Sequence, residues 1–163
     1  MGPDKKFKEK VLPLTDKLFR LAFSIAGNRQ DAEDVVQDAM LKIWQKREEW
    51  GNITNLEGYC LRSVRNIALD KIALKENQLE QIPKHFEIQA PNSVDTEKIE
   101  EEQMEMILKV VSSLPEKQQM VFQLRDIEGM SYKDIEGIMN ISEDQVKVNL
   151  FRARQKIKLY FKV

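Results

Sequence analysis

Residues 142–157 read SEDQVKVNLFRARQKI, and this stretch decides how the C-terminal part of the chain folds. Ser142 is followed three residues later by Gln145, which is the spacing of a capping box at the start of a helix. Apolar residues then recur at steps of three and four, on one face of a helix: Val146, Leu150, Ala153 and Ile157. The stretch therefore predicts a capped amphipathic helix with one buried face.

A second, shorter helix is predicted just before this one. Residues 131–140 begin with a Ser131/Asp134 capping box and end at Asn140, which tolerates the left-handed conformation of a tight turn. Two adjoining helices of these lengths predict a helix-turn-helix with residues 142–157 as the recognition helix. The cations that lie off its apolar face are Lys147, Arg152, Arg154, Lys156 and Lys158. The alternative is that this basic face is only a solvated surface that suits the helix dipole.

The composition is that of a globular protein with one or two domains, since 42% of the 163 residues are hydrophobic. No run of about 18 apolar residues occurs, and the N-terminus lacks the apolar core of a signal peptide. We expect a soluble, cytoplasmic protein without membrane insertion. One cysteine, Cys60, and one histidine, His85, exclude a disulfide framework and argue against a metal or other cofactor. Cys60 is expected to be a small core residue.

The charges are segregated along the chain, although the formal net charge is only −1. Residues 141–163 carry a net charge of +4 and residues 59–75 carry +3, whereas residues 76–106 carry −7. This distribution predicts contact with nucleic acid at two places, with an acidic connector that the phosphate backbone repels.

A 3.6-residue period runs through nearly every segment outside this connector, and no alternating strand pattern persists, so we predict an all-α fold. Residues 76–94, with Pro83 and Pro91 among scattered apolar residues, are predicted to be a flexible acidic linker. When extended, its 19 residues would span on the order of 60 Å, enough to separate two DNA contacts. We therefore expect two small helical domains, residues 1–75 and 95–163, the second with four helices.

The first domain is predicted to contain three helices. The first presents Leu14, Leu18, Leu21, Ala22 and Ile25 and ends at Gly27-Asn28. The second begins at Asp31, extends to about residue 50, and buries Ala32, Val35, Val36, Ala39 and Ile43. A loop over residues 50–55 follows, and a Thr54/Glu57 capping box opens the third helix, from about Asn55 to Lys75. Its apolar face consists of Leu61, Val64, Ala68 and Ile72.

The second helix also carries a stripe of mixed acidic and apolar residues, composed of Asp34, Gln37, Asp38, Leu41 and Trp44. An exposed Leu and Trp beside carboxylates are typical of a protein–protein interface rather than of a solvated surface. The alternative is that Leu41 and Trp44 are buried under the N-terminal helix.

The third helix presents a polar face suited to phosphates and exposed bases, with Arg62, Arg65, Asn66, Asp70 and Lys71. Asn66 and Asp70 could equally form a surface hydrogen-bonding pair, because they are four residues apart on a helix.

Five segments together resemble one known family. DAEDVVQDAMLKIW (31–44) resembles a polymerase-clamp-binding helix, YCLRSVRNIALD (59–70) resembles a −10 element helix, and LPEKQQMVFQLR (114–125), SYKDIE (131–136) and VKVNLFRAR (146–154) resemble a −35 domain. In this order and spacing they resemble an extracytoplasmic-function sigma factor, the two-domain class of the sigma-70 family. The resemblance implies a non-catalytic subunit that binds core RNA polymerase and promoter DNA. It also raises an anti-sigma factor as a candidate partner.

The resemblance implies three sets of site residues. The polymerase-binding set is the acidic-apolar stripe Asp34, Gln37, Asp38, Leu41 and Trp44. The −10 set, whose loop would capture a flipped base, is Asn52, Thr54, Asn55, Tyr59, Arg62, Arg65, Asn66 and Lys71. The −35 set, on the helix that would enter the major groove, is Gln145, Lys147, Val148, Asn149, Phe151, Arg152 and Lys156.

The chain departs from the family pattern at several of these positions. Asn140 stands where Gly is usual, Gln145 where Thr is common, Val148 where a small hydroxyl residue is common, and Asn149 where Arg is common. Lys71 and Lys75 replace arginines at the end of the −10 helix. The promoter sequence of other members therefore does not transfer to this chain.

The competing hypothesis is a stand-alone helix-turn-helix regulator whose N-terminal domain dimerises. A homodimer interface does not require an acidic stripe such as Asp34 to Trp44, which favours the sigma-factor hypothesis. An enzyme has little support, because no Gly-rich phosphate loop, paired-carboxylate cleft or nucleophile motif is present.

Overall fold

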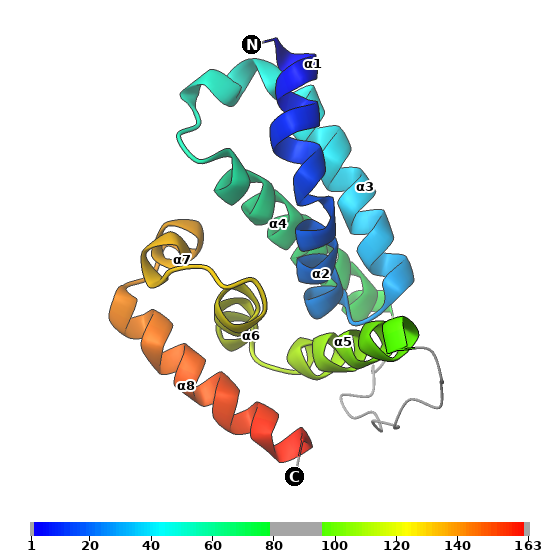
Figure 1. The fold of residues 1–163 in the computed structure, drawn as a ribbon, viewed down its shortest axis with the longest axis vertical. Coiled ribbons are helices and arrows are strands. Elements are labelled where there is room, and N and C mark those ends of the chain that lie inside the picture. The colour runs from blue at the N-terminus through cyan, green and yellow to red at the C-terminus, as the bar shows by residue number, and fades with distance from the viewer. Residues whose placement is uncertain (1, 79–95, 162–163) are drawn as a thin grey trace.

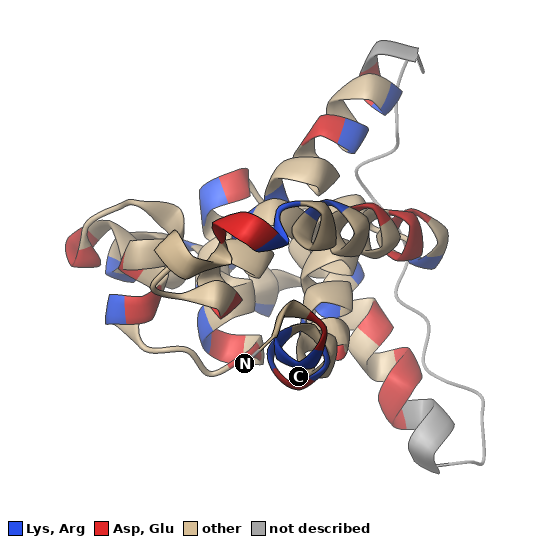
Figure 2. Ribbon diagram, turned by 90° about the horizontal axis from the view of Figure 1, so that it is seen from above, with Lys and Arg blue, Asp and Glu red and all other residues tan. Residues whose placement is uncertain are grey.

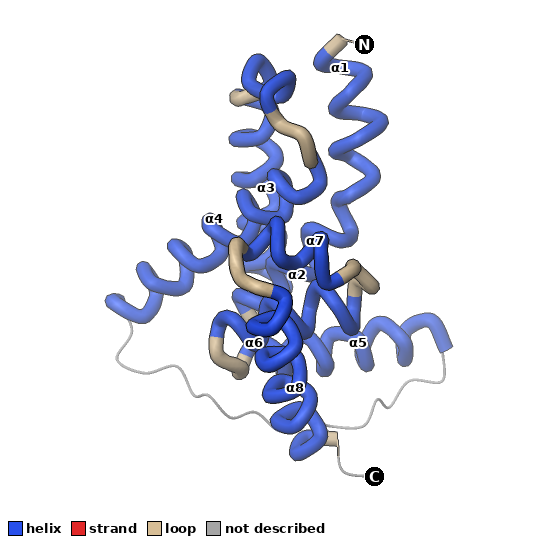
Figure 3. Tube along the Cα trace, turned by 90° about the vertical axis from the view of Figure 1, so that its left-hand side faces the viewer, coloured by secondary structure: helices blue, strands red, loops and turns tan. Residues whose placement is uncertain are grey.

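The computed structural model describes residues 2–78 and 96–161, and all regular structure within these ranges is helical (Figures 1 and 3). This confirms the all-α prediction for the described part. The predicted linker, residues 76–94, lies outside the described residues from position 79 onward. The elements in chain order are α1 (Pro3–Lys6), a π-helical turn (Phe7–Val11), a 3₁₀ turn (Leu12–Leu14), α2 (Thr15–Ala26), α3 (Arg29–Gln45), a 3₁₀ turn (Arg47–Asn52), α4 (Leu56–Gln78), α5 (Thr96–Ser112), α6 (Glu116–Phe122), the π-helical turn η4 (Gln123–Ile127), α7 (Tyr132–Met139) and α8 (Glu143–Tyr160).

The N-terminal unit is built from α2, α3 and α4, which pack against one another around a shared apolar core (Figure 1). The predicted stripe of the second helix is confirmed, because all its members are buried: Ala32, Val35, Val36, Ala39 and Ile43. The predicted stripes of α2 and α4 supply Leu18, Leu21, Ala22, Ile25, Leu61, Val64 and Ala68 to the same core. Leu14 and Ile72, at the ends of these stripes, are only half-buried.

Gly27 and Asn28 form the turn between α2 and α3. Gly27 has a φ of 82°, in the left-handed region that favours glycine, and so it ends α2 as predicted. Asn28 caps the next helix, because its Oδ1 accepts a hydrogen bond of 2.9 Å from the backbone N–H of Asp31. The cap makes α3 start at Arg29, two residues before the predicted start.

The predicted extension of this helix to residue 50 is wrong, because α3 ends at Gln45 and a 3₁₀ turn follows. Trp50, placed in a loop by the sequence, is buried in that turn. Its indole Nε1 donates to the carbonyl oxygen of Ile43 at 3.2 Å. This bond ties the turn back onto the C-terminal end of α3.

The predicted capping box at the start of α4 is also wrong. Asn55, not Thr54, caps this helix, since its Oδ1 accepts from the backbone N–H of Gly58 at 3.0 Å. The carboxylate of Glu57 is bound by Lys17 instead of reaching back to the helix start. The helix also continues to Gln78, three residues beyond the predicted end.

The C-terminal unit contains the predicted helix-turn-helix. Ser131 caps α7, because its Oγ accepts from the N–H of Asp134 at 3.0 Å. Asn140 has a φ of 57° and ends α7 in the left-handed conformation. Ser142 and Gln145 form both hydrogen bonds of a capping box at the start of α8. These features confirm the two capped helices and the turn between them, and α6 packs along α8 to complete this unit.

The two units are packed together. Helix α5 lies mainly against α2, and α7 lies against α4, while α6 is situated between α2 and α8 (Figure 1). At one point the approach is very close: a Cβ added at Gly27 would lie 3.3 Å from Oγ of Ser112, at the end of α5. The described chain therefore forms one closed arrangement of N-terminal and C-terminal helices.

Candidate nucleic-acid and polymerase interfaces

Helix α8 presents the predicted −35 residues on the side away from its buried stripe. Val146, Leu150 and Ala153 are buried against the C-terminal unit. On the other side Val148 is 46% exposed and Phe151 is 64% exposed, so two apolar side chains lie on the same face as the cations. Gln145, Lys147, Arg152 and Lys156 are exposed as well, and Asn149 is half-buried with its Nδ2 donating to the carbonyl oxygen of Gln145. Blue segments, which mark Lys and Arg, recur along the ribbon of α8 near the C-terminus (Figure 2).

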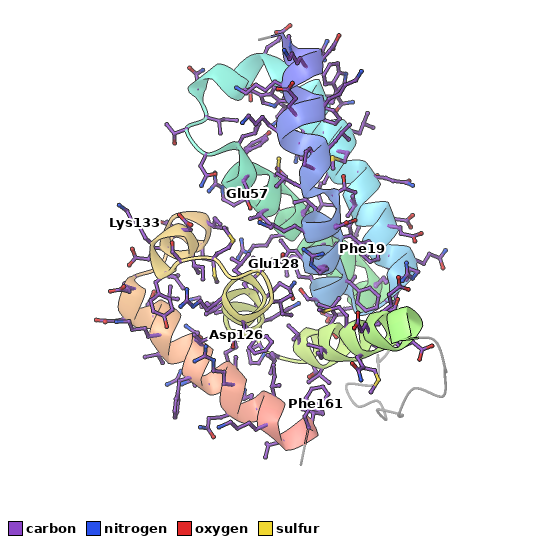
Figure 4. The ribbon with its side chains drawn as sticks, in the orientation of Figure 1. Phe19, Glu57, Asp126, Glu128, Lys133 and Phe161 are labelled. Atoms are coloured by element: carbon purple, nitrogen blue, oxygen red, sulfur yellow. The ribbon has the colours of Figure 1, made fainter. Side chains whose placement is uncertain are left out.

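The cations of α8 are not equivalent. Arg154 forms two hydrogen bonds, of 2.7 and 2.8 Å, to the carboxylate of Asp126, which raises the pKa of Arg154. Asp126 lies beside α8 in the side-chain view (Figure 4). Lys147 lies 3.8 Å from Glu143 and over the ring of Tyr132. Arg154 therefore supports the fold of this unit, whereas Arg152 and Lys156 extend from the exposed face.

The acidic-apolar stripe lies on the outer face of α3. Asp34, Gln37 and Asp38 are exposed, and Leu41 is 58% exposed. Leu41 is thus not covered by the N-terminal helix, contrary to the alternative considered from sequence.

Trp44 differs from the rest of the stripe. It is half-buried, and its ring meets the ring of Phe7 edge-on at 5.4 Å and the ring of Trp50 at 6.3 Å. The guanidinium of Arg47 lies over it at 4.5 Å. The N-terminal segment therefore covers part of the Trp44 side chain, as the alternative considered from sequence expects.

The predicted −10 residues lie along α4 and the loop before it, but they differ in exposure and in hydrogen bonding. Asn52, Thr54 and Asn66 are exposed, and Tyr59 is half-buried. The side chain of Asn55 serves as the helix cap. Asn66 accepts a hydrogen bond of 3.3 Å from Arg65 rather than forming the alternative pair with Asp70.

Several basic residues of α4 are bound by other parts of the chain. Lys71 lies 3.5 Å from the carboxylate of Asp34, on α3. Arg62 donates to the carbonyl oxygen of Gly137 at 3.4 Å, and Arg65 pairs with Glu116. The last two contacts cross from the N-terminal unit to the C-terminal unit.

Sequence reasoning missed the residues that join the units. Arg20 donates two hydrogen bonds of 2.8 Å to the carboxylate of Glu128, whose side chain is only 3% exposed. The same unit boundary is crossed by Gln119, which donates to the carbonyl oxygen of Ser24, and by an ion pair between Arg29 and Glu105. No periodicity or motif signals such contacts, because each partner is polar and lies far from the other in sequence.

Cys60 is buried, and burial raises the pKa of its thiol to about 12, so it is unreactive near neutral pH. Within residues 2–78 and 96–161, no group of His, Cys, Asp and Glu side chains is placed to hold a metal ion. None of the helices in these ranges is long and apolar enough to cross a membrane.

Two consecutive segments of the chain match two regions of one protein family. Residues 12–77 match sigma-70 region 2, and residues 104–157 match sigma-70 region 4. The first segment covers α2, α3 and nearly all of α4, and the second covers most of the C-terminal unit, including α7 and most of α8.

Three curated relatives are named as ECF RNA polymerase sigma factors. The chain is 26% identical over 155 residues to the ECF RNA polymerase sigma factor SigE of Mycolicibacterium smegmatis, covering 93% of this chain and 60% of the relative's length. It is 26% identical over 176 residues to the ECF RNA polymerase sigma-E factor of Haemophilus influenzae, covering 95% of this chain and 93% of that protein. It is 23% identical over 167 residues to the factor SigW of Bacillus subtilis, covering 96% and 89%.

Solved structures share the fold. The sigma factor RpoE of Bartonella quintana, determined in complex with the anti-sigma factor NepR, aligns with a TM-score of 0.76 at 23% identity, over 98% of each chain. CnrH, in complex with the cytosolic domain of CnrY, aligns with a TM-score of 0.67 at 18% identity, over 96% of this chain and 87% of that one. With the region 2 and region 4 matches in order on one chain, the protein belongs to the extracytoplasmic-function group of the sigma-70 family.

Proposed function

We propose that this protein is a promoter-specificity subunit of RNA polymerase, without catalytic activity of its own, that acts in the cytoplasm. The relatives are named for this activity, and the chain spans 60% of the length of the M. smegmatis relative and 93% of the H. influenzae relative. An anti-sigma factor is a further proposed partner, since one accompanies the B. quintana protein in its solved structure.

The observation that carries the proposal is the placement of three different surfaces on one chain. The face of α3 offers exposed carboxylates around Leu41, which suits a basic and apolar groove on a partner protein. The face of α8 offers cations beside exposed Val148 and Phe151, which suits bases and phosphates of a major groove. Helix α4 and its preceding loop offer amides and arginines to unstacked bases.

Each of the three surfaces has its own binding role in promoter recognition. The stripe from Asp34 to Trp44 binds core polymerase, and the −10 set from Asn52 to Lys71 holds bases as the duplex opens. On α8, Arg152 or Lys147 reads guanine or binds phosphate, while Val148 and Phe151 contact a thymine methyl group.

Reconstitution with core RNA polymerase tests the proposal. The purified chain added to core enzyme is expected to start transcription at a defined set of promoters, which genome-wide mapping of start sites after overexpression identifies. The expected result is promoter-specific transcripts that depend on the chain. Tight palindromic duplex binding without polymerase, and no effect on start-site choice, would contradict it.

A further inference from the structure

Three aromatic rings pack together where α3 ends and the 3₁₀ turn Arg47–Asn52 begins. Phe7 belongs to the N-terminal π-helical turn, Trp44 to the last turn of α3, and Trp50 to the 3₁₀ turn. The ring of Phe7 is stacked on that of Trp50, with centroids 6.3 Å apart, and meets Trp44 edge-on at 5.4 Å. Trp44 and Trp50 are also edge-on, at 6.3 Å. Each ring contacts the other two, and the three residues form an aromatic cluster.

Trp50 connects the aromatic cluster to the loop of the proposed −10 set. It is only 3% exposed, and its indole Nε1 donates to the carbonyl oxygen of Ile43 at 3.2 Å. Its own carbonyl oxygen accepts from the backbone N–H of Ile53 at 3.1 Å, which closes the turn directly before Thr54. The side chain and the backbone of Trp50 together fix where the loop starts.

The other end of this loop is fixed separately. The side chain of Asn55 caps α4 through the N–H of Gly58, and its carbonyl oxygen accepts from the N–H of Tyr59 at 3.0 Å. Asn52 and Thr54, which lie between Trp50 and this cap, are exposed. A loop that is anchored at both ends presents such side chains in one geometry, as the recognition of an unstacked base requires.

Phe7 brings the N-terminal segment into this anchor. In Figure 1 the N-terminal segment, in dark blue, lies beside the turn that follows α3, at the top of the molecule. The π-helical turn that contains Phe7 packs against α4, and Val11 in the same turn is fully buried. Aromatic pairs at such distances stabilise a structure beyond the area that they bury. Loss of the Phe7 ring would therefore leave the Trp50 indole less firmly held.

We propose that Phe7 and Trp50 are positioning residues that hold the loop from Asn52 to Asn55 in the shape that takes an unstacked base of the −10 element. The binding of a base by this loop rests on the proposed function, whereas the packing of Phe7 on Trp50 does not. Both residues act through the exposed side chains of Asn52 and Thr54.

Phe7→Leu tests the proposal, since it keeps a large apolar side chain and removes the ring. Holoenzyme formed with this variant at saturating core polymerase is expected to lose about two- to tenfold in base discrimination at the −10 position held by the loop. This is the fold-change that one aromatic pair corresponds to. Selection over randomised −10 sites measures it. Selection over randomised −35 sites is expected to return the wild-type preference, because the aromatic cluster lies in the other unit.

Three further variants make the test specific. Trp50→Phe keeps a ring but removes the donor to Ile43, and it is expected to weaken −10 discrimination as well. Phe7→Tyr keeps the ring and is expected to retain the wild-type preference. Phe19→Leu is the matched control, because Phe19 is also a half-buried phenylalanine of the N-terminal unit, but its ring meets Phe23 edge-on at 6.0 Å. This control is expected to keep the wild-type −10 preference.

Intrinsic fluorescence reports on the aromatic cluster without DNA or polymerase, since both tryptophans of the chain belong to it. Phe7→Leu is expected to shift the emission of the free protein to longer wavelength, because the indoles gain contact with water. Helicity by circular dichroism should stay unchanged. Phe19→Leu is expected to keep the wild-type emission.

The outcomes separate this proposal from the proposed function. Three results would overturn the positioning role: −10 discrimination in Phe7→Leu as sharp as in wild type, equal loss of −10 and −35 discrimination, or a loss in Phe19→Leu as large as in Phe7→Leu. A wild-type holoenzyme without promoter-specific transcripts contradicts the proposed function instead. The fluorescence measurement then decides whether Phe7 holds the turn: a shift in Phe7→Leu supports this role, and wild-type emission overturns it.

Discussion

Specific neighbours shift the pKa of single residues in this protein, and Asp31 is one example. Partial burial disfavours its charged form, but hydrogen bonds from Lys75 and Asn28 outweigh that effect and lower the pKa of Asp31 below its ordinary value of 3.8. A carboxylate whose pKa is lower in the folded state stabilises that state above its unfolded pKa.

Asp31→Asn is therefore expected to lower the free energy of unfolding near neutral pH. The difference from wild type should begin to shrink as the pH falls past 3.8, where Asp31 of the unfolded chain is protonated, and should be lost only below the lower pKa of the folded carboxylate. Urea unfolding at a series of pH values measures it. Glu33→Gln, at an exposed position of the same helix, is the control and should change little. A difference that stays constant with pH would show that lost packing, not charge, is responsible.

Arg152 is predicted to read a base. Arg152→Ala is expected to cost about 1–3 kcal/mol at the preferred −35 element and to flatten discrimination at one position, as measured by selection over randomised −35 sites. Lys156→Ala should instead weaken binding to all sequences and reduce the salt slope by about one. Arg154→Ala is the matched arginine control, since Asp126 already binds that side chain. An unchanged base preference in Arg152→Ala would leave Arg152 only a positioning role on the backbone.

At the scale of helices, the sequence predicted most of what local patterns control. The core stripes of α3 and α8 and the caps at Ser131 and Ser142 follow from periodicity and spacing, and the structure has them where predicted, except that Ile157 at the end of the α8 stripe is only half-buried. The errors lie where two local options compete. Asn55 and Thr54 can both cap α4, and Asn55 does so, since its Oδ1 lies 3.0 Å from the amide of Gly58. Which sites contact polymerase or DNA remains a prediction.

Helix α3 is predicted to be the main polymerase contact. Leu41→Arg or Asp38→Arg is expected to weaken binding to core polymerase, because an interface tolerates neither lost apolar contact nor reversed charge. Helicity should remain, since Leu41 is 58% exposed in the free protein. Pull-down with core enzyme measures the effect, with Glu9→Arg as an exposed control outside α3. Full retention of core enzyme by both stripe variants would exclude this face.

At the scale of the whole molecule, promoter opening should depend on α4 more than the first encounter with duplex DNA does. Asn66→Ala is expected to impair strand opening, followed by permanganate footprinting, more than closed-complex formation, followed by gel shift. Bases become available to α4 only as they unstack. Asp70→Ala, one turn further along the same helix, is the control. Equal defects in the two variants would indicate the surface pair considered from sequence, and equal loss in both assays would indicate simple duplex contacts.

The closed arrangement is the part that the sequence could not predict. Arg20 and Glu128 are separated by 108 positions, and either residue alone resembles any surface charge. Charge segregation and the acidic connector predicted two units that each contact DNA and left their placement in the free protein open. The described chain has the units in contact, through α2 with α5 and α4 with α7. Long-range polar pairing leaves no periodic signal, and so only the structure reveals it.

The π-helical turn η4 gives this arrangement an unusual sensitivity to chain length. Asp126, within this turn, lies beside Arg154 of α8, and Glu128, directly after it, lies beside Arg20 of α2. Deleting one residue between 123 and 125 would turn Asp126 and Glu128 together by about 100° around the helix axis. A point substitution, in contrast, can remove the carboxylate of Asp126 or that of Glu128 without moving the other. Such a deletion would therefore disturb the Asp126–Arg154 pair and the Arg20–Glu128 pair at once.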